Sequence, residues 1–105
     1  MKTIFGLYQL AAKDYNENLR TLREDPETVT MVGADLIYSL QNDLRLMMST
    51  IEEVNNTLGG TFIREHDEYG YIKKIVSQTP HTGCAVEFDF DIFEFVPVPY
   101  DMHAH

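Results

Sequence analysis

The sequence predicts an α+β fold, in which an antiparallel helical hairpin with one long helix packs on a three-stranded antiparallel sheet. From residue 7 to 58, apolar residues recur every three or four positions, as they do on one face of a helix. From residue 61 to 96 they alternate with polar residues, as in strands. The 105 residues suffice for one hydrophobic core, so we expect a single domain over residues 1–105.

The longer helix is expected over residues 26–58. Asp25 is suited to cap its first amides, Pro26 fits its first position, and Gly59 and Gly60 can end it. About 30 residues at about 1.5 Å each give a rod about 45–50 Å long, which a small domain cannot cover fully. We therefore expect a homodimer through this helix or through a sheet edge. The apolar stripe comprises Val29, Val32, Leu36, Leu40, Leu44, Met47, Ile51, Val54 and Leu58.

A shorter helix is expected over residues 7–24, because Tyr8, Tyr15, Leu19 and Leu22 keep a helical spacing. The break at Asp25 is short, so the two helices should fold back on each other as a hairpin.

Three strands are expected at residues 61–67, 71–77 and 84–96. In the third strand, Val86, Phe88, Phe90 and Ile92 would face the helices, together with a buried and inert Cys84. Pro97 and Pro99 should end this strand and begin an extended tail over residues 97–105.

Acidic residues dominate the C-terminal part of the chain. The formal net charge is -9, and residues 84–105 hold five acidic residues and no Lys or Arg. Glu87, Asp89 and Asp91 would lie about 6.6 Å apart on one strand face, a spacing similar to that of successive phosphates in a nucleic acid. This row predicts a partner-binding surface, although a solvated sheet face would give the same pattern. The candidate binding residues are Glu87, Asp89, Asp91, Phe93, Glu94, Phe95 and Tyr100.

Other classes of function have less support in the sequence. The single cysteine excludes an internal disulfide, and no apolar run approaches the length of a membrane span, so we expect a cytoplasmic protein. The histidines His66, His81, His103 and His105 do not form a convergent ligand set, so we expect neither a metal nor a cofactor. We find no nucleophile elbow or phosphate loop.

These features favour a small acidic inhibitor that binds another protein. Phage-encoded anti-defence proteins, such as those directed against CRISPR systems, and nuclease-immunity proteins have this size and charge. No motif assigns the chain to a family. The expected partner is a basic nucleic-acid-handling protein whose groove is blocked by steric and electrostatic mimicry, with no direct binding of nucleic acid or membrane. Two alternatives are a dimeric structural or regulatory module built on the long helix, and a small enzyme that uses Glu65, His66, Asp67 and Glu68.

Overall fold

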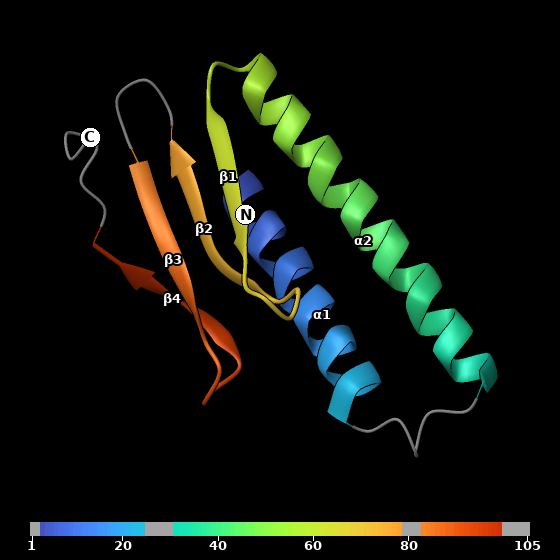
Figure 1. Cartoon of the computed structure of the whole chain (residues 1–105). Helices are drawn as coiled ribbons and strands as arrows, with labels where there is room; N and C mark the ends of the chain where they lie inside the picture. Colours follow the sequence, from blue (N-terminus) through green and yellow to red (C-terminus); the bar gives the residue numbers. More distant parts are fainter. Residues whose placement is uncertain (1–2, 25–30, 79–82, 100–105) are drawn as a thin grey trace.

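The computed structural model describes residues 3–24, 31–78 and 83–99, and it has the predicted α+β class. Two helices, α1 (Ile4–Glu24) and α2 (Met31–Thr57), pack against an antiparallel sheet. Its strands lie in the order β1 (Thr61–His66), β2 (Ile72–Gln78), β3 (Gly83–Asp89) and β4 (Glu94–Val98). Figure 1 shows the helices side by side, with α1 behind the strands and α2 beyond β1.

The short helix begins three residues earlier than predicted. Thr3 precedes α1, and its hydroxyl accepts a hydrogen bond of 2.9 Å from the amide of Gly6. This is the geometry of an N-cap, in which a side chain satisfies an amide that has no partner within the helix. The apolar spacing alone placed the start at residue 7, because spacing carries no information about a capping hydrogen bond such as that of Thr3.

The long helix is continuous from Met31 to Thr57, in agreement with the prediction for its central part. Its predicted first residues, 26–30, lie outside the described ranges, as does the expected cap at Asp25. The helix ends at Thr57, one residue before the predicted end, and the predicted glycines follow it: Gly59 has a φ of 87°, and the amides of Gly59 and Gly60 donate to the carbonyls of Asn56 and Asn55. These paired bonds are the Schellman ending that glycine permits.

The prediction of one strand over residues 84–96 was wrong, because β3 and β4 are joined by a turn at residues 90–93. The carboxylate of Asp89 accepts hydrogen bonds from the amides of Asp91 at 2.9 Å and Ile92 at 3.5 Å. Such local bonds compete with a sheet ladder, so the alternating Phe and Asp residues turn back instead of continuing. Within the residues that the structure describes, the sheet therefore has four strands where three were predicted.

Pro97 does not end the last strand as predicted, since β4 runs through it to Val98. β4 is an edge strand, and an edge tolerates a residue that has no amide hydrogen to donate. The extended tail predicted from residue 97 therefore does not begin there, and residues 100–105 lie outside the described ranges.

A register shift between β1 and β2 brings two isoleucines into the core. Glu65 pairs with Lys74, but His66 pairs with Ile72, so Lys73 is an extra residue in β2. Ile72 and Ile75 are three positions apart, and both are fully buried because this bulge restores the inward direction. They pack with residues of α1 and α2, including Tyr8, Ala12, Tyr15 and Met48.

The stripe predicted for the core of α2 is only partly covered. Its members Leu44 and Ile51 pack against the core from the margin, beside Met48, which lies outside the predicted stripe and is fully buried. Five other members are largely exposed, because α1 and β1 cover a different part of the helix surface. They are Leu36, Leu40, Met47, Val54 and Leu58.

Candidate protein-binding surface

Two turns meet at one end of the sheet and expose large apolar side chains there. The turn between β1 and β2 carries Tyr69, and the turn between β3 and β4 carries Phe90 and Ile92; these three are 46% to 59% exposed. The rings of Tyr71 and Phe90 lie 5.6 Å apart, so the two turns are in contact. We call this surface the turn end and define it by Glu68, Tyr69, Phe90, Asp91 and Ile92.

A cluster of phenylalanines supports the turn end from within. The ring of Phe88 is 5% exposed and lies 4.8–4.9 Å from the rings of Phe90, Phe93 and Phe95 in edge-on contacts. Aromatic pairs in this geometry contribute about 0.5–1.5 kcal/mol beyond their buried area. Phe90 is thereby held in place although nearly half of it is exposed.

The C-terminal part of α1 adds arginines to the same end of the molecule. The guanidinium of Arg20 lies 4.6 Å from the centre of the Phe93 ring, and that of Arg23 lies 4.8 Å from the Tyr69 ring. Arg23 also donates a hydrogen bond to the carbonyl of Tyr69. Arg20 and Phe93 line a hollow of about 180 Å³ with Glu24, Tyr71 and Phe90. Three elements that are distant in sequence therefore build one surface.

Phe93 has a backbone conformation that residues with a large side chain rarely adopt. Its φ is 58°, in the left-handed region that glycine occupies at little cost. Such a residue costs about 1–3 kcal/mol and persists only where its surroundings stabilise it. Here the ring contacts with Phe88 and Arg20 provide that stabilisation, and strained residues of this kind cluster at functional sites.

The predicted acidic row does not form a single strand face. Glu87 lies in β3, where it pairs across the sheet with Lys74 of β2. Asp89 ends β3 and uses its carboxylate in the turn, whereas Asp91 lies in the turn and is exposed. Glu94 forms an ion pair of 3.1 Å with Lys13 of α1. The regular spacing of about 6.6 Å therefore ends at Asp89, because the chain reverses after it and Asp91 leaves the strand.

The remaining predicted binding residues have different positions. Phe93 is half-buried in the turn, and Phe95 is half-buried against the core. Tyr100 lies outside the described ranges. Of the predicted binding residues, the structure thus places Asp91 in the turn end, with Asp89 and Phe93 in or next to the same turn and Phe95 packed against Phe88. The prediction that Phe90 and Ile92 face the helices was wrong, since both are exposed in the turn that follows Asp89. Tyr69, Arg20 and Arg23 were also missed, because only tertiary packing brings them to Phe90 and Phe93.

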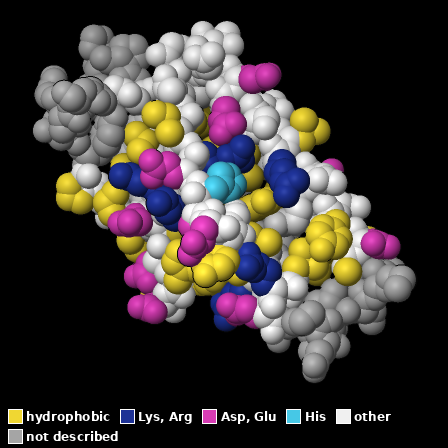
Figure 2. All heavy atoms as spheres, viewed as in Figure 1, with side chains coloured by type: hydrophobic (Ala, Val, Ile, Leu, Met, Phe, Trp, Pro, Cys, Tyr) yellow, Lys and Arg dark blue, Asp and Glu magenta, His cyan; other side chains and the backbone are white. Residues whose placement is uncertain are grey.

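Charges of both signs are distributed over the molecule. Figure 2 shows Lys and Arg side chains lying between Asp and Glu side chains on one face. Several cations are engaged within the chain, such as Arg20 with Glu24 at 3.0 Å and Arg64 with Glu52 at 3.7 Å. Asp91 and Glu68, in contrast, are exposed and have no ion pair with any residue that the structure describes. The excess of acid thus includes two carboxylates at the turn end.

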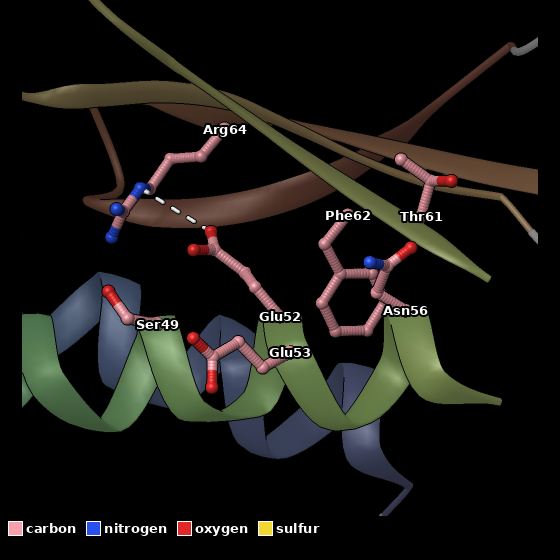
Figure 3. A pocket seen from close by; sticks show the side chains of 7 residues that line it. All are labelled: Ser49, Glu52, Glu53, Asn56, Thr61, Phe62 and Arg64. Carbon is pink, nitrogen blue, oxygen red and sulfur yellow. Dashed lines mark ion pairs between the residues drawn. The ribbon is translucent and has the colours of Figure 1, made fainter. Parts of the chain in front are cut away.

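A second candidate site is an open hollow of about 520 Å³ between α2 and β1. Figure 3 shows Arg64 and Phe62 reaching from β1 toward α2, where Arg64 meets Glu52. Glu52 also accepts a hydrogen bond from the hydroxyl of the fully buried Tyr8. Burial, and then the bond to Glu52, raise the pKa of Tyr8 well above its usual value, so this hydroxyl stays protonated. The group joins α1, α2 and β1, and we interpret it as structural.

The acidic cluster at residues 65–68 serves the turn between β1 and β2. The carboxylate of Asp67 accepts hydrogen bonds from the amides of Tyr69 at 2.9 Å and Tyr71 at 3.0 Å. The Nδ1 of His66 lies 2.9 Å from the carbonyl oxygen of Gly70. Asp67 and His66 thus have structural partners, which weakens the alternative that the cluster is an enzyme site.

Cys84 is exposed at the start of β3, so the prediction that it is buried was wrong. Its neighbour across the sheet is Ser77, with which the thiol forms a hydrogen bond. Partial burial nevertheless raises the pKa of the thiol, which disfavours the reactive thiolate.

Within the described ranges, no group of three His, Cys, Asp or Glu side chains is placed to hold a metal ion. Neither α1 nor α2 combines the length and hydropathy needed to cross a membrane. Comparison with protein-family models, curated proteins and solved structures finds no match to this chain.

Proposed function

We propose that this protein is a small acidic inhibitor that acts by binding another protein through the turn end. The observation that carries the proposal is the exposure of Tyr69, Phe90 and Ile92 beside two exposed carboxylates, those of Asp91 and Glu68. The ring of the buried Phe88 packs against Phe90 and supports this surface. Aromatic side chains are enriched at the centres of protein interfaces, where they bury much surface at little cost in conformational entropy.

The expected partner is a basic, nucleic-acid-handling protein. With a net charge of -9 the chain repels nucleic acid, whereas it attracts a basic surface over a distance and accelerates the encounter. Asp91 and Glu68 would meet cations of the partner, and the aromatic residues would fill apolar hollows between those cations. Binding would block the partner's nucleic-acid groove sterically. This mechanism relies on two carboxylates and on aromatic contacts, and it does not require a row of evenly spaced carboxylates that mimics a nucleic acid.

Affinity capture with a matched pair of variants tests this proposal. The test variant carries Asp91→Lys and Ile92→Ser in the turn, where both side chains are exposed. The control carries Asp35→Lys and Tyr38→Ser on α2; Tyr38 and Ile92 are each 59% exposed, and the change in charge is the same. Circular dichroism establishes that both variants are folded.

Wild type and control are expected to retain the same basic protein from an extract of the source cell, and the turn variant is expected to lose it. Loss of one member of a buried charge pair typically costs about 2–5 kcal/mol, enough to remove a complex of micromolar affinity. Equal retention by the turn variant would contradict the proposed surface. Retention of an acidic protein alone would contradict the proposed class of partner.

A further inference from the structure

An exposed apolar stripe runs along α2 on the side away from the strands. Leu36, Leu40, Met47, Val54 and Leu58 are 47% to 70% exposed. At about 100° per residue they fall within about 40° of one another on the helix surface. These five residues form the exposed stripe, and the other two described members of the predicted stripe, Leu44 and Ile51, continue its apolar surface toward the core. Contiguous apolar surface of this kind marks an interaction site.

The stripe is symmetric about its central residue. Leu40 and Val54 each lie seven positions from Met47, and Leu36 and Leu58 each lie eleven positions from it. In two antiparallel helices related by a twofold axis at one residue, each position lies opposite the position that is equally far from that residue in the other direction along the chain. A twofold axis at Met47 therefore pairs Leu36 with Leu58, Leu40 with Val54, and Met47 with itself.

We infer that the occupant of this stripe is a second copy of the chain, packed antiparallel about a twofold axis at Met47. A twofold interface must be self-complementary, and an apolar pattern that is symmetric about one residue meets that condition. An unrelated partner would require no such symmetry. The inference is independent of the proposed function, because the turn end is a different surface.

The charges beside the stripe permit this arrangement. Asp43 is the exposed acid nearest to the stripe, and it lies four positions from Met47. In the antiparallel pair, the two Asp43 residues are displaced by about 12 Å along the helix axis. That displacement exceeds the Debye length of about 8 Å at physiological salt, so their repulsion is largely screened.

The mass of the full chain in solution is the first test. Light scattering at 100 µM should give about twice the chain mass of 12.1 kDa. Met47→Asp would bring two carboxylates together on the axis and should return the mass to that of one chain. Tyr38→Asp places the same charge on another exposed side of α2 and should leave the dimer intact. A wild-type monomer, or a dimer that Met47→Asp leaves intact, would overturn the inference.

Engineered disulfides determine the direction of packing. Helix axes about 8–10 Å apart place facing Cα atoms within reach of a disulfide. In a Cys84→Ala background, Met47→Cys should form a reducible disulfide-linked dimer under mild oxidation. Leu36→Cys alone should not, since its two copies would lie about 33 Å apart. A mixture of Leu36→Cys and Leu58→Cys chains should form a linked pair.

A parallel arrangement would reverse the last two results. Linking of Leu36→Cys to itself, without linking in the mixture, would therefore overturn the twofold geometry. Failure of Met47→Cys to link in a sample whose mass is that of a dimer would exclude this stripe as the interface.

Discussion

Asn16 holds α1 on the sheet through both ends of its amide. Its Nδ2 donates to the carbonyl of Ile72 at 2.9 Å, and its Oδ1 accepts from the Ile72 amide at 2.8 Å. Ile72 lies beyond the last pair between β2 and β3, Lys74 with Glu87. The side chain of Asn16 thus bonds both backbone groups of Ile72, which pairs with His66 of β1 in the ladder, and Asn16 is itself fully buried.

Asn16→Ala should therefore lower the free energy of unfolding by about 2–5 kcal/mol, because it leaves two buried backbone groups without partners. Asn18→Ala is the control on the same helix, since Asn18 is only half-buried, and it should change stability by about 0.5 kcal/mol or less. Urea unfolding of the two variants measures both values. Equal losses would contradict the role assigned to Asn16.

Tyr8 makes a pH-dependent contribution to stability. Its pKa is raised in the folded protein by burial and by the bond to Glu52, so the folded state favours the protonated hydroxyl. That contribution is complete below the unfolded pKa of about 10 and is lost as the pH rises above it. The wild type should therefore lose stability between about pH 9.5 and 11.

Tyr8→Phe should be less stable than the wild type at pH 8, by about 1–3 kcal/mol for a lost bond to a charged group. The difference between the two proteins should shrink as the pH rises toward 11, since only the wild type has this group to titrate. Denaturant unfolding across that range tests the prediction. A difference that stays constant with pH would contradict it.

At the scale of elements, the turn between β3 and β4 depends on Asp89. Asp89→Ala removes the acceptor for two turn amides and should lower the free energy of unfolding by about 1–2 kcal/mol. Asp91→Ala removes an equally charged but exposed side chain from the same turn and should have little effect. Thermal unfolding compares them, and a larger loss for Asp91→Ala would contradict this account.

The elements also show which features could be predicted from the sequence. α2 was predictable because its apolar spacing is regular and Gly59 and Gly60 follow it. The turn after Asp89 was not, because alternating Phe and Asp residues resemble a strand until the side-chain bonds are known. The bulge at Lys73 was missed for a related reason: Ile72 and Ile75 face the same way only after the register shifts.

The covered part of α2 could not be predicted either. The predicted stripe together with Met48 spreads over about 160° of the helix circumference at about 100° per residue. Only the packing of α1 and β1 decides that Met48 is buried while Met47 is exposed. The candidate site was likewise predicted only in part. Asp91 and Phe93 were predicted because they lie close together in the sequence, whereas Tyr69 and Arg20 join the site only through tertiary contacts.

At the scale of the whole molecule, the protein presents two separate surfaces. The stripe on α2 is apolar and symmetric, which suits a second copy of the chain. The turn end combines aromatic residues with Asp91 and Glu68, which suits a basic partner. Met47→Asp should therefore separate the chains and still allow each to capture the partner, as affinity capture with this variant would show. Loss of capture on separation would mean that the two surfaces act together.

Displacement of nucleic acid from the captured partner shows whether the turn end blocks the partner's nucleic-acid groove. A fluorescent DNA or RNA bound to that partner is titrated with wild type, with the Asp91→Lys and Ile92→Ser variant, and with the Asp35→Lys and Tyr38→Ser control. We expect wild type and control to release the labelled strand, with an association rate that falls steeply as salt rises, whereas the turn variant should not release it. A wild-type complex that binds the partner while the labelled strand stays bound would contradict the account.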